Sequence, residues 1–69
     1  MEILAENLLK LRKARKLSRQ TVADAVGISA KSYERYENAE REPTASVLVA
    51  LADFYGVSLD YLVGRTDQR

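Results

Sequence analysis

Apolar residues recur along the chain at the spacing of α-helices, and short polar stretches separate the apolar segments. Leu4, Leu8 and Leu11 fall on one face of a helix that this pattern predicts over residues 3–16. No segment alternates apolar and polar residues with the period of two that marks a half-buried strand. The pattern therefore predicts an all-α protein.

Residue types that begin and end helices divide the rest of the chain into four further helices. Serine or threonine, which caps helix N-termini, stands ahead of each one: Ser18, Ser29, Thr44 and Ser58. Glycine, which ends helices in the left-handed conformation, follows three apolar helical segments: Gly27, Gly56 and Gly64. The expected helices span residues 18–26, 30–38, 45–55 and 59–63. Five short helices with short connections predict one compact domain over residues 1–69.

The 69 residues carry a net charge of only +1, but the charges are unevenly distributed. Residues 10–35 hold eight Lys or Arg and two acidic residues, a net +6, whereas the remainder holds three basic and eight acidic residues, a net −5. Such asymmetry is typical of a basic face directed at a polyanion, although solvated charges without a partner give the same pattern. Four of the basic residues are expected to supply long-range attraction rather than specific contacts: Lys10, Lys13, Arg15 and Lys16.

The residue inventory argues against an enzyme. The chain has no His and no Cys, which are the usual general base, nucleophile and metal ligands. It also lacks a glycine-rich phosphate loop, so we expect no catalysis, cofactor, metal or small-molecule ligand in this domain. The first residues lack the apolar run of a signal peptide, and the longest apolar run, residues 47–52, is too short to span a bilayer. We therefore expect a soluble, cytoplasmic protein with no membrane partner.

The segment 18–38 has the features of a helix-turn-helix unit. Ala23 has almost no side chain, so the following helix can pass close to the helix that contains it. Gly27 can adopt a positive φ without penalty and so turn the chain sharply, after which Tyr33 and Tyr36 point back toward the core. Two helices that cross steeply through a short glycine-containing turn form such a unit. An ordinary helical hairpin in a small bundle is the alternative.

The outward face of the third predicted helix is polar and carries two cations. At about 100° per residue, the side opposite the two tyrosines has Ala30 at its edge and four polar residues: Lys31, Glu34, Arg35 and Asn38. Because an α-helix fits the major groove of DNA, these side chains can meet base edges. We expect Arg35 to read a guanine and Lys31 to contact a base or a phosphate. For Arg35, a surface ion pair with a neighbouring glutamate is the alternative.

Beyond these features, the chain resembles the Cro/cI-type helix-turn-helix family, also called the XRE family, from residue 8 to about residue 67. The matching segments are LRKARKLS (11–18), VADAVGIS (22–29), YERYENAEREPT (33–44) and LADFYGVSLDYLVGRTD (51–67). The resemblance implies a five-helix, lambda-repressor-like domain that binds double-stranded operator DNA as a homodimer. It implies a regulator of transcription, with a repressor as the favoured role.

The resemblance also implies roles for individual residues. Base reading or anchoring of the recognition helix is implied for Ser29, Ala30, Lys31 and Arg35. Contacts from a loop to DNA phosphates are implied for Asn38, Arg41 and Thr44. Arg12 and Glu37 match a pair that forms a salt bridge between the first helix and the end of the third.

Two positions depart from the family pattern. Arg19 occupies the first position after the cap of the second helix, where the family usually has a glutamine that binds a phosphate. An arginine can bind a phosphate there with a full charge. Ala30 stands where several relatives carry a base-reading glutamine, and it can offer only a methyl contact, for example to thymine. The base preferences of relatives therefore do not transfer to this chain.

The last predicted helix carries more apolar surface than one helical face can bury. We expect part of this surface to pair with a second copy of the chain, through Phe54, Val57, Leu59, Tyr61, Leu62 and Val63. Two-fold pairing would place two reading helices about 34 Å apart, which is one turn of DNA. The alternative is that these side chains close the core of the monomer.

A protein-interaction module is the main alternative to a DNA-binding regulator. Some members of the resembled family act as antitoxins, whose main partner is a protein. Such a role requires an additional apolar or acidic docking surface, and the acidic segment 37–42 is a short candidate. A basic recognition face favours DNA instead.

Overall fold

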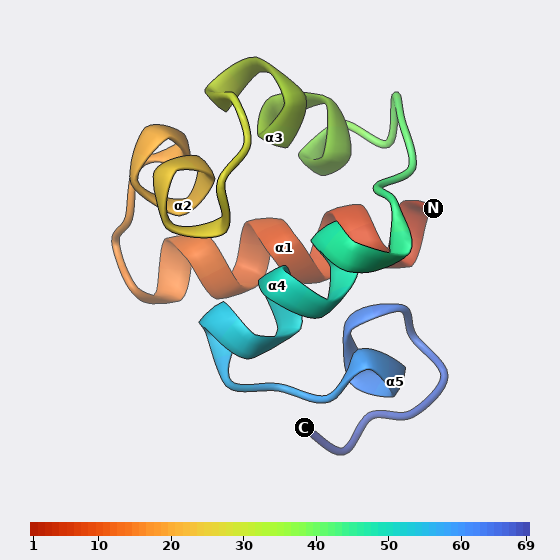
Figure 1. The fold of residues 1–69 in the computed structure, drawn as a ribbon. Coiled ribbons are helices and arrows are strands. Elements are labelled where there is room, and N and C mark those ends of the chain that lie inside the picture. Colours follow the sequence, from red (N-terminus) through yellow and green to blue (C-terminus); the bar gives the residue numbers. More distant parts are fainter.

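The computed structural model describes all 69 residues, which form five α-helices and no strand (Figure 1). The helices are α1 (Glu2–Ala14), α2 (Arg19–Val26), α3 (Ala30–Glu37), α4 (Ala45–Tyr55) and α5 (Leu59–Leu62). The predicted all-α fold with five helices is therefore confirmed. None of these helices combines the length and the apolar character that crossing a membrane requires.

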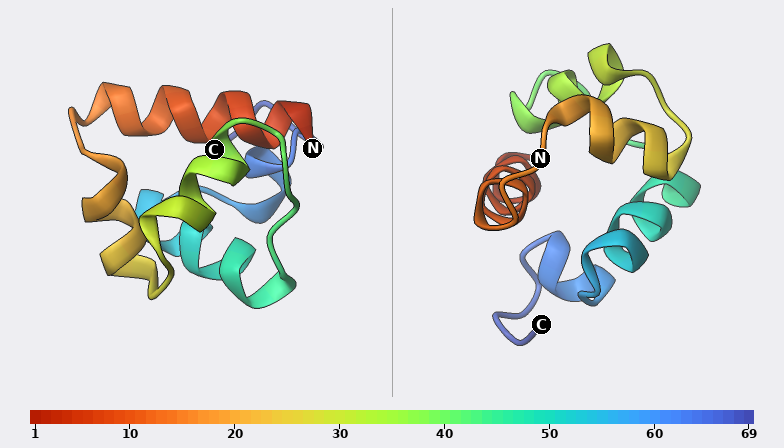
Figure 2. Two further views of the ribbon diagram at one scale, coloured as in Figure 1. Left: turned by 90° about the horizontal axis from the view of Figure 1, so that it is seen from above. Right: turned by 90° about the vertical axis from the view of Figure 1, so that its left-hand side faces the viewer.

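The helices close around a single core. The longest helix, α1, lies along one edge of the molecule, with α2 and α3 on one side of it and α5 on the other (Figures 1 and 2). α1 contacts α3 and α5, α2 contacts α3 and α4, and α4 contacts α5. The pair formed by α2 and α3 is therefore supported from below by α1 and α4.

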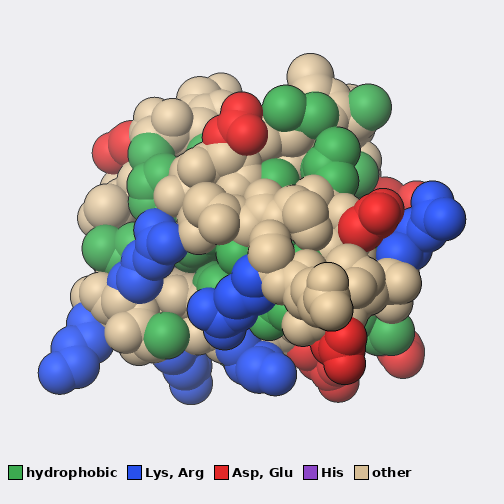
Figure 3. Space-filling model, turned by 90° about the horizontal axis from the view of Figure 1, so that it is seen from below, with side chains coloured by type: hydrophobic (Ala, Val, Ile, Leu, Met, Phe, Trp, Pro, Cys, Tyr) green, Lys and Arg blue, Asp and Glu red, His purple; other side chains and the backbone are tan.

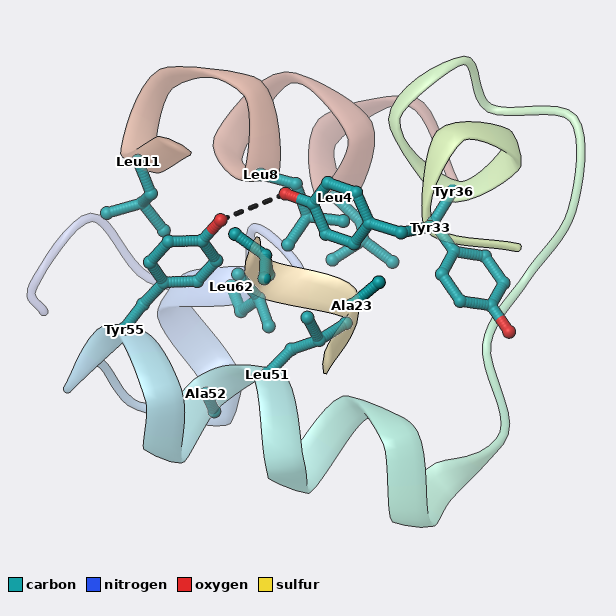
Figure 4. Close-up of a cluster of buried hydrophobic side chains, with 11 residues drawn as sticks. Leu4, Leu8, Leu11, Ala23, Tyr33, Tyr36, Leu51, Ala52, Tyr55 and Leu62 are labelled. Carbon is teal, nitrogen blue, oxygen red and sulfur yellow. Dashed lines mark hydrogen bonds between the residues drawn. The ribbon is translucent and has the colours of Figure 1, made fainter. Parts of the chain in front are cut away.

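The core contains side chains from all five helices (Figure 4). Its buried members are Leu4, Leu8, Leu11, Val22, Ala23, Tyr33, Tyr36, Leu51, Ala52, Tyr55 and Leu62. Burial of a large apolar side chain contributes about 1.5–3 kcal/mol each, so this cluster is the main source of stability. The leucines predicted to face inward from the first helix all belong to it.

Two buried tyrosines join α3 to α4 inside this core. The hydroxyls of Tyr33 and Tyr55 are 2.9 Å apart and form a buried hydrogen bond (Figure 4). Burial raises the pKa of both phenols, so both stay neutral and one hydroxyl donates to the other. No buried side-chain nitrogen or oxygen in the chain lacks a hydrogen-bond partner. The pair therefore places two polar groups in the core without leaving either unsatisfied.

The predicted caps form at the N-termini of α2 to α5. In each case the hydroxyl oxygen of the cap accepts a hydrogen bond from the backbone N–H three residues ahead: Ser18, Ser29, Thr44 and Ser58. Such a cap contributes about 0.5–2 kcal/mol. The α4 boundaries match the prediction, because a threonine cap and a glycine at φ +67° mark both ends.

Three helices end earlier than predicted, and for α5 the difference is one residue, Leu62 instead of Val63. α1 ends at Ala14 rather than near Lys16, because Lys16 adopts the left-handed conformation at φ +56°. α3 ends at Glu37, and Ala39 takes the same conformation at φ +58°. In both turns a backbone N–H reaches back to the carbonyl five residues earlier, at 3.2 Å after α1 and 2.9 Å after α3. Lysine and alanine carry no sequence signal for this termination, whereas glycine does.

Candidate nucleic-acid interface

The turn between α2 and α3 has the geometry that the sequence predicts. Gly27 ends α2 at φ +77°, and the Ile28 N–H donates to the carbonyl of Ala23 at 3.0 Å. The Ala23 side chain is fully buried, and α2 packs directly against α3. Ser29 then caps α3 and allows the new helix to start at once. The segment therefore forms a helix-turn-helix unit.

The two faces of α3 differ in burial. Tyr33 and Tyr36 point inward and are 0% and 6% exposed. Lys31 and Arg35 are exposed on the other face. Neither cation forms a salt bridge or a side-chain hydrogen bond within the chain, and the ion pair considered for Arg35 is not formed. Both side chains are therefore free to bind an external partner.

The remaining predicted contact residues surround this face. Asn38 and Arg41 lie in the loop after α3, and both are exposed. Thr44 ends the loop and its hydroxyl caps α4, as the Ser29 hydroxyl caps α3. In the view from above, α2, α3 and this loop are spread across the face that is turned toward the viewer (Figure 2, left). Ala30 differs from these residues, because it is half-buried and packs against the core.

A buried carboxylate lies behind this face. Glu37 is the last residue of α3, and its side chain is 1% exposed. Its two oxygens accept from Arg12 Nε at 2.6 Å and from Arg12 Nη2 at 3.0 Å, so the pair that the family resemblance implies is formed. Arg12 also donates to the carbonyl of Leu17 at 3.0 Å. The bonds tie α1 to the end of α3 and to the turn before α2.

Glu37 also binds a second arginine, which the sequence does not predict. Arg19 Nε donates to Glu37 Oε1 at 3.2 Å, and the Arg19 side chain is 43% exposed. Burial alone would raise the pKa of the Glu37 carboxyl. The hydrogen bonds and charge of Arg12, together with the Tyr33 hydroxyl and the hydrogen bond from Arg19, outweigh burial and lower this pKa. The carboxylate is therefore ionised at neutral pH.

The structure corrects the expectation that Arg15 supplies only long-range attraction. Its Nη1 and Nη2 donate to the carbonyls of Phe54 and Tyr55, at 3.1 and 2.6 Å. The guanidinium also lies 6.0 Å from the centroid of the Phe54 ring and 5.3 Å from that of the Tyr55 ring. Carbonyls at a helix C-terminus lack partners within the helix and attract cations. Arg15 therefore caps α4 and joins it to α1.

The basic side chains are not confined to the side of the molecule that carries α2 and α3. The face seen from below, away from these two helices, shows several Lys and Arg side chains gathered toward its lower left, and acidic side chains at its lower right and at several other places (Figure 3). The charge asymmetry of the sequence therefore does not translate into a single basic face. No group of three or more acidic, His or Cys side chains is arranged to hold a metal ion.

The predicted pairing surface requires one correction. Leu62 is 0% exposed and lies in the core, because α5 packs against both α1 and α4 and turns this side chain inward. Leu59 is 41% exposed. Three other residues of this set are half-buried against the core: Phe54, Val57 and Tyr61. Val63 is also half-buried. Arg69 also lies over the Tyr61 ring, 5.4 Å from its centroid.

Comparison with known proteins assigns the chain to a family. The family model described as helix-turn-helix matches residues 8–62. The chain is 44% identical over 62 residues to the uncharacterized HTH-type transcriptional regulator YobD of Bacillus subtilis, covering 90% of this chain and 55% of that protein. It is 42% identical over 62 residues to the cryptic phage CTXphi transcriptional repressor RstR of Vibrio cholerae, with the same coverage of 90% and 55%. The chain thus spans about half the length of these curated relatives.

Solved structures share the fold. The P22 c2 repressor, crystallised in complex with a synthetic operator, superposes with a TM-score of 0.84 at 29% identity, covering 90% of this chain and 94% of that one. A transcriptional regulator from Listeria innocua superposes with a TM-score of 0.86 at 29% identity, covering 96% of this chain and 62% of that one. Together with the matched segment and the helix-turn-helix geometry, these likenesses show that the chain belongs to the XRE-type helix-turn-helix family.

Proposed function

We propose that the chain is a sequence-specific, double-stranded DNA-binding domain of a transcriptional regulator, with repression as the favoured role. The observation that carries the proposal is the outward face of α3, where Lys31 and Arg35 are exposed and unpaired on a helix held rigidly from behind. An α-helix with such a face fits the major groove of DNA. The family membership and the likeness to a repressor crystallised with its operator support the same proposal.

Three residues of α3 are proposed to read bases. Arg35 donates two parallel hydrogen bonds to a guanine, which is worth about 1–3 kcal/mol of discrimination against another base. Lys31 contacts a base or a phosphate from the first turn of the helix. Ala30 offers the exposed part of its methyl group to a thymine, since a methyl contact is the only one that an alanine side chain can make.

A second set is proposed to bind the DNA backbone or to anchor the recognition helix: Arg19, Ser29, Asn38, Arg41 and Thr44. They lie around α3, at the starts of α2, α3 and α4 and in the loop that follows α3. Contacts to phosphates fix the position of a protein on the duplex without reading its sequence. The exposed arginines of this set, Arg19 and Arg41, also make binding depend on salt.

The domain is proposed to bind as a homodimer through the apolar surface of α5 and the segment before it. Leu59 supplies the most exposed apolar side chain of this surface, and Phe54, Val57, Tyr61 and Val63 surround it. Two-fold pairing places two copies of α3 in major grooves about one DNA turn apart. Sedimentation equilibrium tests the pairing, and a monomer at high concentration both with and without DNA would contradict it.

The test of the function is selection of bound duplexes from a random DNA library, followed by affinity measurements on the selected duplex at several salt concentrations. We expect a palindromic motif with half-sites about one turn apart, and an affinity that falls steeply with salt. Weak binding without an enriched motif would contradict sequence-specific regulation. That result would favour the protein-interaction module, of which antitoxins are one class.

A further inference from the structure

Glu37 binds two guanidinium groups, and the two differ in exposure. The Arg12 side chain is 12% exposed and donates two hydrogen bonds to the carboxylate, at 2.6 and 3.0 Å. The Arg19 side chain is 43% exposed and donates one, through Nε at 3.2 Å. Arg19 is therefore the outer member of a chain of three charged groups that begins in the protein interior.

The charges of this group do not balance. The single negative charge of Glu37 is already matched by Arg12, which binds both carboxylate oxygens. The positive charge of Arg19 therefore stays uncompensated, and its two terminal nitrogens form no hydrogen bond within the chain. An anion on the exposed side of Arg19 would balance the charge and occupy those donors, since a guanidinium binds phosphate in a planar, bidentate manner.

The position of the group connects it to the recognition helix. Arg19 is the first residue of α2 and Glu37 is the last residue of α3. Gly27 joins the two helices at one end of the unit, and the Arg19–Glu37 bond joins them at the other. Any anion bound by Arg19 is thus linked through one carboxylate to the end of α3.

We infer that Glu37 is a positioning residue for DNA binding: its carboxylate holds the Arg19 guanidinium by Nε and presents the two terminal nitrogens to a phosphate of the backbone. This inference rests on the proposed function. It explains how Arg19 can bind a phosphate at the position where the family usually has a glutamine. A lysine at this position keeps the charge but has no planar group that Glu37 can orient while the phosphate is bound. Orientation, and not charge alone, is therefore the contribution of Arg19.

The experiment compares Arg19→Lys, Arg19→Gln and the control Arg65→Lys on a duplex selected by the wild-type chain, by fluorescence anisotropy at several salt concentrations. The Arg65→Lys control makes the same chemical change on the C-terminal segment, at a side chain that is 77% exposed. We expect Arg19→Lys to weaken binding about tenfold with an unchanged salt slope. Arg19→Gln weakens binding at least as much and also lowers the slope by about one. Arg65→Lys binds like the wild type.

A second readout on the free protein separates positioning from a contribution to folding alone. Thermal unfolding checks that each variant is folded at the temperature of the binding assay. Exchange of the arginine Nε–H with water, followed by NMR, should be slow for Arg19, because its Nε donates to the buried Glu37 at 3.2 Å. It should be fast for Arg65, whose Nε lies 4.0 Å from the exposed carboxylate of Asp60, too far for a hydrogen bond.

Three outcomes would overturn the inference. A folded Arg19→Lys variant that binds within about twofold of the wild type contradicts orientation by Glu37 while leaving the proposed function intact. Exchange at Arg19 as fast as at Arg65 contradicts the bond that the inference needs. A wild-type chain that selects and binds no duplex overturns the proposed function and this inference together.

Discussion

On the inward face of α3, Tyr33 and Glu37 are buried and hydrogen-bonded to neighbouring helices. On its outward face, Lys31 and Arg35 are exposed and bonded to nothing in the chain. Folding therefore fixes one side of this eight-residue helix and leaves the other to recognition. The comparison implies that changes to the two faces have separate effects, on stability for the inner face and on DNA binding for the outer.

The largest expected effect is on the inner face. Glu37→Ala leaves the Arg12 guanidinium without its partner in a site where it is 12% exposed, and loss of one partner of a buried pair costs about 3–5 kcal/mol. Urea denaturation should show this loss in the free energy of unfolding. Glu40→Ala, at an exposed glutamate in the loop after α3, is the control and should change stability by less than about 0.5 kcal/mol. A Glu37→Ala loss no greater than the control would contradict the account of the buried pair.

The next effect is on the outer face. Arg35→Ala should remove discrimination at one base pair of the selected duplex, worth about 1–3 kcal/mol, because the bidentate contact to guanine is lost. The stability of the Arg35→Ala variant should stay close to that of the wild type, since the Arg35 side chain forms no salt bridge within the chain. Binding to a panel of single-base variants of the duplex measures the effect. Weakening that is equal at every base pair would assign Arg35 to a phosphate instead.

An effect of similar size, on stability instead of binding, is expected for the buried tyrosine pair. Tyr33→Phe removes one hydroxyl and leaves that of Tyr55 unpaired in the core, at a cost of about 1–3 kcal/mol. The double variant Tyr33→Phe/Tyr55→Phe should lose less than the sum of the two single variants, since no hydroxyl is then left unpaired. Denaturation of the four proteins measures the coupling. Strict additivity would show that the two hydroxyls do not interact.

The smallest effect is a dependence of stability on pH. The pKa of the Glu37 carboxyl is lower in the folded chain than its ordinary value of 4.5. Its contribution to stability is therefore complete above about pH 4.5 and is lost as the pH falls through the folded pKa. Denaturation between neutral and acidic pH should show a steeper loss for the wild type than for Glu37→Gln. Parallel curves would mean that Glu37 does not titrate with folding.

Most of the fold follows from local signals in the sequence. The threonine before α4 and the glycine after it define that helix, and the caps and apolar spacing locate α2 and α5. The ends of α1 and α3 do not follow from the sequence. Lys16 and Ala39 take the left-handed conformation there, although neither is a glycine, the residue type that usually marks it. The burial of Leu62 does not follow either, because the sequence of a four-residue helix does not show which neighbours that helix packs against.

In the candidate site, too, some features can be predicted from the sequence and others cannot. The spacing of residues on one helix predicts that Lys31 and Arg35 share an exposed face, because helical geometry fixes which side chains lie together. The Arg12–Glu37 pair follows only from the family resemblance, and two contacts of the site do not follow from the sequence at all. These are the bond from Arg19 to Glu37 and the cap of α4 by Arg15, which join residues 18 and at least 39 positions apart. Only the three-dimensional arrangement of the helices brings such partners together.

The measurement that tests the central claim most directly is an NMR titration of the chain with its selected duplex, which locates the bound surface residue by residue. The account predicts that the largest changes occur at Lys31 and Arg35, with further changes at Arg19 and in the loop after α3. The buried pair of tyrosines should change little. Changes concentrated at the exposed lysines of α1, Lys10 and Lys13, or on the outer surface of α4, with α3 unaffected, would contradict recognition by α3.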